Sequence, residues 1–237
     1  MAYQGTALWR EPEGPCLRNF NERKAVDSVN GALALRPQIE KIVDQLWEEG
    51  FDGIWYMGIG GTWASALQAE VYLRGKTALP VYAENAAEFL TTGNKRFTSR
   101  SVLVYSSVSG NTKEMVELVD KVKSLGARVV AFIDTPGSAL TQPGKWDHLL
   151  CYPQNEQLKF YMLANYLLYK NGEFPHYDRY NREMEEHLAE DLADIEEMTD
   201  AWAYQYAKEK AAFVKARPDL PHYFIGSGNQ YGATYSY

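Results

Sequence analysis

The sequence predicts an α/β protein: a three-layer α/β/α sandwich built on a parallel sheet of about five strands. Short runs rich in β-branched and aromatic residues alternate with stretches of helical periodicity. Clusters of glycine or serine stand between two of these runs and the helical stretches that follow them. Because such alternation is typical of βαβ units, we expect the strands to be parallel and the ligand to bind at their carboxyl ends.

The predicted elements follow one another in a regular order. The first helix begins near Pro37, with apolar residues at helical spacing, and Gly50 is placed to end it. Strands are expected at Gly53–Met57, Leu79–Ala83, Ser101–Tyr105, Arg128–Ile133 and His148–Tyr152. Further helices are expected at Trp63–Arg74, Lys113–Ser124 and Glu156–Lys170.

The chain divides into four predicted parts. Residues 1–36 form an N-terminal extension, 37–172 the α/β domain, and 173–220 a linker whose apolar residues recur at helical spacing. In residues 221–237, an apolar run leads into Gly226-Ser227-Gly228 and then an aromatic and small residues, repeating the pattern around Gly58–Ala64. We therefore expect 221–237 to be the start of a second copy of the domain, which ends after one strand and a few helical residues.

Composition excludes several classes of partner. The 237 residues carry a net charge of −7, whereas nucleic acids and anionic membranes require a basic face. No apolar stretch is long enough for a membrane span or a signal peptide, so we expect a cytoplasmic protein. Neither the two cysteines nor the four histidines show metal-ligand spacing, and no metal or organic cofactor is implied.

Gly58-Ile59-Gly60-Gly61-Thr62 lies between a predicted strand and a predicted helix. Glycines there allow a sharp turn and the close approach of a ligand, and Thr62 is expected to cap the helix and offer a hydroxyl to an anion. A dinucleotide-binding turn would need glycine in place of Trp63, and no Gly-Lys-Ser/Thr sequence follows this loop at the spacing of a P-loop. By itself this loop is a weak indication of phosphate binding.

Ser106-Ser107-Val108-Ser109-Gly110-Asn111-Thr112 concentrates hydroxyl groups between the next central strand and its helix. Three hydroxyls and neighbouring N–H groups at a helix start can surround a phosphate. An ordinary serine-capped loop would have the same composition. The presence of both loops in one chain favours phosphate binding.

Four segments together resemble the SIS (sugar isomerase) family: Gly60-Gly61-Thr62, Glu84–Phe89, Ser107–Thr112 and Pro136–Leu140. Within it, the chain is similar to bacterial deglycases of fructosamine 6-phosphates, such as fructoselysine 6-phosphate, and to the isomerase half of glucosamine-6-phosphate synthase. The resemblance covers about Pro37 to Lys170, with a renewed start after Pro221. It departs from the family at Val108, where a glutamine is common, so a side-chain contact to the sugar would be lost.

The resemblance implies a site and an activity. The phosphate would be bound by Gly60, Gly61, Thr62, Ser107, Val108, Ser109, Gly110 and Thr112. The activity would be isomerisation or deglycation of a phosphorylated fructosamine or amino sugar in a homodimer or larger oligomer. The family's principal catalytic glutamate follows the second glycine loop, and a histidine lies beyond it, so we expect this sequence alone to bind substrate without full turnover.

Glu88 is the candidate catalytic carboxylate, because it lies in a family segment and a carboxylate near a bound sugar could move protons. It could equally be a helix-face or capping residue. Glu156 and Lys159 could reach the ligand, although an exposed ion pair would explain them as well. Two other functions stay open: a non-catalytic sugar-phosphate-binding or regulatory module, and a nucleotide-binding domain.

Overall fold

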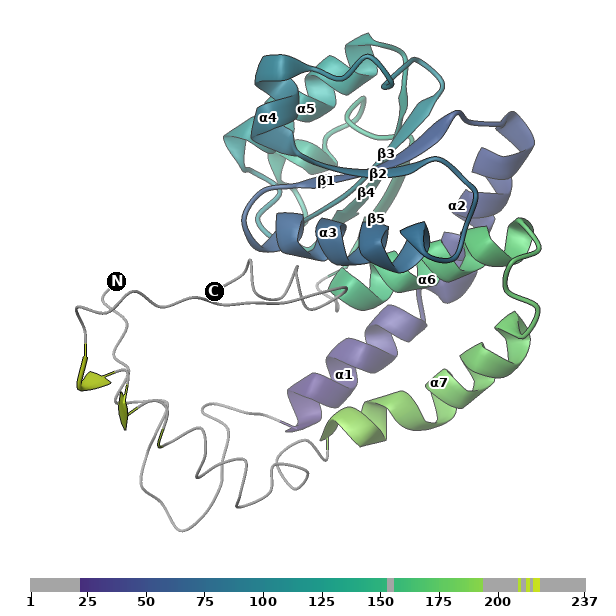
Figure 1. Ribbon diagram of the computed structural model, residues 1–237, viewed down its shortest axis with the longest axis vertical. Coiled ribbons are helices and arrows are strands. Elements are labelled where there is room, and N and C mark those ends of the chain that lie inside the picture. The colour runs from purple at the N-terminus through teal and green to yellow at the C-terminus, as the bar shows by residue number, and fades with distance from the viewer. Residues whose placement is uncertain (1–21, 153–155, 194–208, 210–211, 214, 218–237) are drawn as a thin grey trace. The chain divides into compact units, whose positions relative to one another are not determined.

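A computed structural model describes residues 22–152, 156–193, 209, 212–213 and 215–217 (Figure 1). Gly31–Asn181 belong to one compact unit, and the described segments 22–30 and 182–193 belong to a second. The larger unit contains the whole sheet and both predicted ligand loops. The predicted second copy at 221–237 lies outside the described residues, and the division into four parts stays a prediction.

The sheet has five parallel strands in the order β2-β1-β3-β4-β5. They are β1 (Gly53–Gly58), β2 (Val81–Asn85), β3 (Ser101–Ser107), β4 (Arg128–Ile133) and β5 (His148–Cys151). The chain passes from β1 outward to β2 and then crosses to β3 on the other side of β1. The order therefore reverses between β1 and β3, and this is where such sheets bind ligands.

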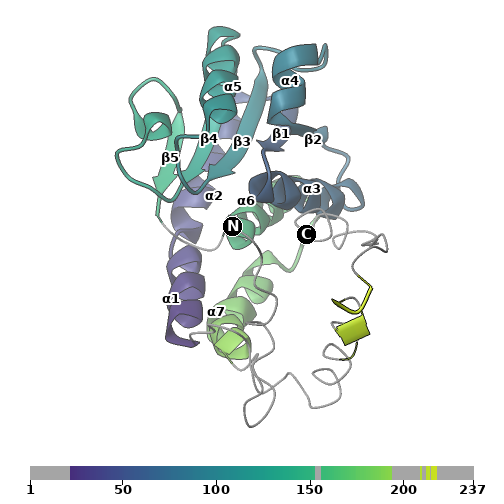
Figure 2. The same cartoon turned by 90° about the vertical axis from the view of Figure 1, so that its left-hand side faces the viewer.

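Helices cover both faces of the sheet, as predicted (Figure 2). One face carries α4 (Ala86–Thr92) and α5 (Lys113–Ser124), and the other carries α2 (Arg36–Glu49), α3 (Gly61–Arg74) and α6 (Glu156–Lys170). The remaining helices are α1 (Glu22–Leu33), the short η2 (Ala139–Thr141) and α7 (Tyr177–Ala193). The sequence did not predict α4, whose seven residues are too few for a helical period to be evident.

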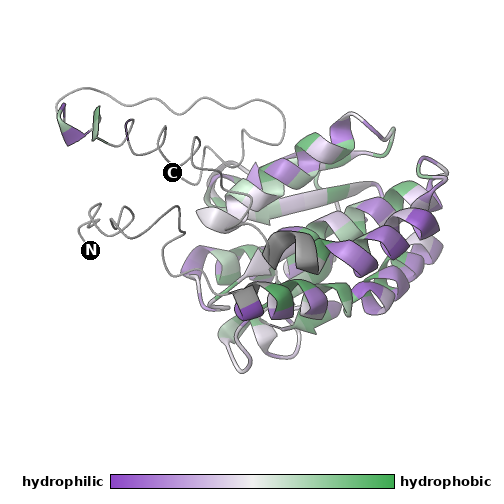
Figure 3. Ribbon diagram, turned by 90° about the horizontal axis from the view of Figure 1, so that it is seen from below, coloured by the Kyte–Doolittle hydropathy of each residue, from purple (hydrophilic) through white to green (hydrophobic). Residues whose placement is uncertain are grey.

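Every residue of β1 and β3 is buried, because helices cover both sides of these central strands. On the α5 side, Trp55, Leu103 and Val129 belong to one continuous apolar core. On the α6 side, the Phe160 ring packs edge-on against Tyr56 and Phe132, with ring centroids 5.3 and 5.9 Å away. Hydrophilic and hydrophobic residues alternate along the helices (Figure 3), and in α2 and α5 the buried residues are hydrophobic.

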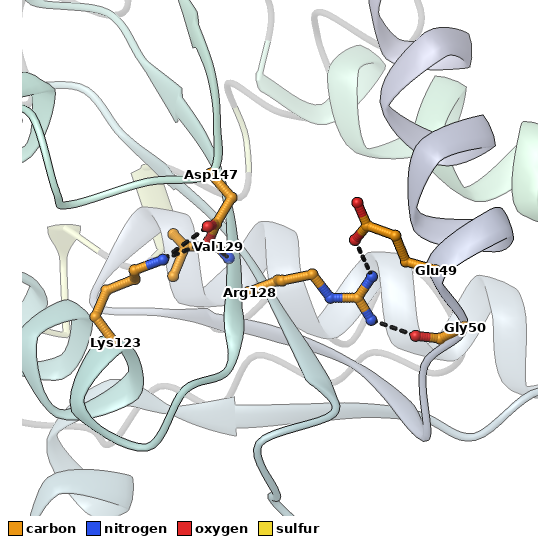
Figure 4. Close-up of polar contacts among 6 residues, drawn as sticks. All are labelled: Glu49, Gly50, Lys123, Arg128, Val129 and Asp147. Carbon is orange, nitrogen blue, oxygen red and sulfur yellow. Dashed lines mark hydrogen bonds and ion pairs between the residues drawn. The ribbon is translucent and has the colours of Figure 1, made fainter.

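The amino edge of the sheet is closed by side chains that pair with one another (Figure 4). The Arg128 guanidinium donates to Glu49, at 2.7 Å, and to the carbonyl oxygen of Gly50. The Asp147 carboxylate accepts from Lys123 Nζ at 2.7 Å and from the backbone N–H of Val129 at 2.8 Å. These contacts join the ends of α2 and α5 to the starts of β4 and β5.

Candidate functional site

The two predicted ligand loops lie at the carboxyl edge, on either side of the point where the strand order reverses. The glycine loop (Gly58–Thr62) follows β1, and the serine loop (Ser107–Thr112) follows β3. Their strands are paired in parallel, with Met57 opposite Tyr105. Paired strands lie about 4.8 Å apart, so the structure brings both loops to one place.

The glycine loop turns tightly into α3. A Cβ atom added to Gly58 would lie 2.6 Å from the carbonyl carbon of Thr62, and Gly60 has a φ of 60°. The Thr62 hydroxyl folds back on Ile59, accepting from its N–H at 3.1 Å and donating to its carbonyl oxygen at 3.0 Å. The expectation that Thr62 caps α3 is therefore wrong: Gly60 is the N-cap residue, and no side chain caps this helix.

Gly60 and Gly61 leave their surroundings open. A Cβ atom added to either would have no atom within 4 Å, in contrast to Gly58. Among the described residues, no hydrogen bond engages the N–H group of Gly60 or Gly61. The start of α3 therefore offers unpaired donors that an anion can approach closely.

In the serine loop, two of the three predicted hydroxyls converge. Ser109 Oγ and Thr112 Oγ1 lie 3.4 Å apart on the exposed side of the loop. Ser107 is buried, and its Oγ accepts from the Gly110 N–H at 3.1 Å. Ser107 thus stabilises the turn, and its hydroxyl proton is still available to an acceptor.

The helix starts at this edge differ in how their N–H groups are satisfied. Thr112, the N-cap residue of α5, makes no side-chain cap, and within the described part of the chain no hydrogen bond engages the N–H groups of Val108, Ser109 or Thr112. At α4, the Asn85 side chain accepts from the N–H groups of Ala87 and Glu88. The free donors are therefore concentrated at α3 and α5.

Val108 is the most exposed of the large hydrophobic residues on the described surface, at 59%. Its carbonyl oxygen accepts from Thr135 Oγ1 at 2.7 Å, which holds the backbone at the start of the serine loop. An apolar side chain therefore lies exposed next to the convergent hydroxyls, in the position where the family commonly has glutamine.

Glu88, the predicted catalytic carboxylate, lies exposed in the first turn of α4. Glu84, which the sequence analysis did not single out, is the last residue but one of β2 and accepts from Asn94 Nδ2 at 3.0 Å. Partial burial and the nearby Glu88 carboxylate both raise the pKa of Glu84, while the Asn94 hydrogen bond and Lys121 oppose them. Burial is the stronger effect and could not be judged from the sequence.

One sequence interpretation placed Lys159 in an exposed ion pair with Glu156, but the structure does not. Its side chain is fully buried, and its ammonium group lies 3.1 Å from Asp134 Oδ1 at the end of β4. The local i, i+3 spacing with Glu156 gave no indication of this tertiary partner. The ion pair lies next to the serine loop, because the Asp134 N–H donates to the carbonyl oxygen of Ser107.

The remaining candidates add little to this site. His148 lies at the amino end of β5, where burial lowers its pKa, and His176 and His187 are exposed on the part of the chain around α7. His222 lies outside the described residues. The described residues contain no group of three acidic, histidine or cysteine side chains placed to hold a metal ion. None of the described helices is both long and apolar enough to span a membrane.

The parallel sheet and its strand order define a doubly wound α/β domain, with the two donor-bearing loops as the candidate ligand site at its switch point. The particular family follows from comparison. Residues 52–168 match the SIS domain model, which confirms the resemblance to the SIS family inferred from the sequence.

Known relatives agree with this assignment. Glutamine–fructose-6-phosphate aminotransferase (isomerizing) of Pyrococcus horikoshii is 26% identical over 124 residues, which are 52% of this chain and 20% of that protein. A candidate phosphosugar isomerase of Bacillus subtilis superposes with a TM-score of 0.64 at 19% identity, covering 91% of this chain and 64% of that one. The C-terminal domain of glucosamine-fructose-6-phosphate aminotransferase from Francisella tularensis gives a TM-score of 0.60 at 16% identity, with the same coverage.

Because the sequences of these structural neighbours are less than 25% identical to this one, the likeness shows the fold alone. The chain spans a fifth of the length of the curated relative and less than two thirds of each of the two solved chains.

Proposed function

We propose that the carboxyl edge of this SIS domain binds the phosphate of a phosphorylated sugar. The observation that carries the proposal is a group of donors around the switch point. It comprises the N–H groups that have no partner among the described residues, those of Gly60, Gly61, Val108, Ser109 and Thr112, together with the convergent hydroxyls of Ser109 and Thr112. Phosphate accepts such bonds strongly, and the starts of α3 and α5 add their partial positive charge. No lysine or arginine cluster is needed, which fits the acidic composition.

The proposed activity is isomerisation or deglycation of a phosphorylated fructosamine or amino sugar. This chemistry requires a base to take a proton from the carbon next to an imine or carbonyl group, and an acid to return it. Glu88 is the candidate from this domain, with Glu84 beside it. In the family, the principal catalytic residues belong to a second domain. We therefore propose that this domain binds and orients the substrate. We also propose that the protein is cytoplasmic and forms a homodimer or larger assembly.

A non-catalytic sugar-phosphate sensor is the second candidate function. One observation favours it: the Glu84 carboxylate is already hydrogen-bonded to Asn94. The two functions predict the same ligand. They differ in whether a bound fructosamine 6-phosphate is consumed.

The binding proposal is tested with the S109A/T112A variant. Titration calorimetry with glucosamine 6-phosphate and a fructosamine 6-phosphate should show affinity about 10- to 100-fold weaker than for the wild type, because two charge-assisted hydrogen bonds are lost. The melting temperature should change little, since Ser109 is exposed and Thr112 is partly exposed.

Ser124→Ala is the matched control, since it removes a hydroxyl from the far end of α5. It should bind like the wild type. Unchanged affinity in S109A/T112A, or tighter binding of NAD or ATP than of any sugar phosphate, would contradict the proposal. Consumption of the fructosamine 6-phosphate by the wild type would favour the enzyme over the sensor.

A further inference from the structure

The segment that follows β4 runs beside the serine loop and is hydrogen-bonded to it along its length. We name Asp134–Leu140 the brace loop. The Asp134 N–H donates to the carbonyl oxygen of Ser107 at 3.1 Å, and the Leu140 N–H donates to that of Gly110 at 3.0 Å. Together with the bond from Thr135 to Val108, these contacts attach the brace loop to the backbone of the serine loop at three points.

The brace loop also packs tightly under the serine loop. Ser138 is 5% exposed, and its Oγ would lie 1.9 Å from a Cβ atom added to Gly110, which has a φ of 63°. Only glycine fits at position 110 for both reasons. The buried Lys159–Asp134 ion pair holds the other end of the brace loop against α6.

Asn111 is the serine-loop side chain that bonds to the brace loop. Its Oδ1 accepts from the Ala139 N–H at 2.9 Å, and its Nδ2 donates to the carbonyl oxygen of Ser109 at 3.0 Å. Its own N–H donates to Ser109 Oγ at 3.2 Å. The side-chain amide therefore uses its donor and its acceptor at once, and it ties the backbone of Ser109 to the brace loop, while the backbone N–H of Asn111 holds the Ser109 hydroxyl.

We propose that Asn111 is a positioning residue for the phosphate: it does not bind the ligand but holds Ser109 where its hydroxyl meets that of Thr112. The proposal rests on the proposed function. A free loop would lose conformational entropy when it closes around the ligand, whereas a loop already held by Asn111 and the brace loop loses less. Replacing Asn111 should therefore weaken phosphate binding without removing a contact to the ligand.

A double-mutant cycle tests this role. Ala139→Pro removes the N–H group that donates to Asn111 at a position where proline is tolerated, because Ala139 begins η2 and Ser138 before it is extended. By calorimetry with glucosamine 6-phosphate, N111A and A139P should each weaken binding about tenfold, with little change in melting temperature. The double variant should be no weaker than N111A, because both remove the same contact.

Asn111→Asp adds a pH profile that a merely structural role would not produce. At neutral pH the carboxylate lacks the donor and repels the anion, so affinity falls. As the pH is lowered toward about 4, the protonated carboxyl regains both a donor and an acceptor, so the ratio of wild-type to N111D affinity should shrink.

Three results overturn the inference. The first is a wild-type affinity in N111A. The second is a double variant whose loss of affinity is the product of the losses in N111A and A139P. The third is a ratio of wild-type to N111D affinity that does not vary with pH. If S109A/T112A loses binding but N111A does not, this inference alone fails. If the wild type binds no sugar phosphate at all, the proposed function fails and this inference fails with it.

Discussion

The two edges of the sheet use polar groups in opposite ways. At the amino edge, Arg128 and Asp147 bond to partners on α2, α5 and the neighbouring strand, and Asp52 accepts from Thr98 and Ser101. At the carboxyl edge, the N–H groups of Gly60 and Gly61 in the glycine loop and of Val108, Ser109 and Thr112 in the serine loop lack such partners in the described structure. Satisfied groups contribute to stability, whereas groups left free can bind a ligand. The amino edge therefore contributes to stability, and the carboxyl edge is the one available for binding a ligand.

The largest expected effect comes from removing a closed contact at the amino edge. Asp147→Ala leaves the Val129 N–H and the Lys123 ammonium without their acceptor, so the free energy of unfolding should fall by about 1–2 kcal/mol. Urea denaturation measures this change. Asp147→Asn, which keeps an acceptor oxygen, should cost less. Sugar-phosphate affinity should be unchanged in both folded variants, and a parallel loss of affinity would show that the two edges are coupled.

A second substitution sharpens the comparison within a single helix. Gly61 begins α3 and Gly75 follows its end; neither has a positive φ, and a Cβ atom at either meets open space. Gly61→Ala should weaken sugar-phosphate binding by about 1 kcal/mol, roughly fivefold, because the methyl group enters the space the ligand would use. Gly75→Ala should bind normally. Equal affinities would show that the phosphate does not approach the glycine loop.

The smallest expected effect concerns Glu84. Its folded-state pKa is raised above the ordinary value of 4.5, chiefly by burial, so the folded protein binds its proton more tightly than the unfolded chain does. Stability should therefore decrease as the pH rises from 4.5 through the raised pKa, and Glu84→Gln should remove that part of the decrease. The difference should be a few tenths of a kcal/mol, because solvent still reaches this carboxyl. Denaturation of both proteins between pH 4 and pH 7 measures it, and identical profiles would contradict the assignment.

Much of the fold was predictable because its signals are local. Strand and helix periods occur within single segments, and the helices at 113–124 and 156–170 and the strand at 128–133 have the predicted bounds. Strand ends were less certain: β1 and β3 extend to Gly58 and Ser107, since pairing with neighbours continues into the loops. The predicted oligomer, the catalytic role of Glu88 and the second copy of the domain stay predictions.

The sequence by itself determined that two donor-rich loops follow two strands of a parallel sheet, because hydroxyl and glycine residues there are visible at fixed places in the chain. Only the tertiary structure decided which of their groups are free. Thr62 is engaged by Ile59, Ser107 by Gly110 and the start of α4 by Asn85, whereas Ser109 and Thr112 converge. Asn111 and Lys159 acquire their roles from Ala139 and Asp134, which lie about 25 residues or more away in sequence. Hydrogen bonds depend on distance and direction in space, and these are set only once the strands have paired and the helices have packed on them.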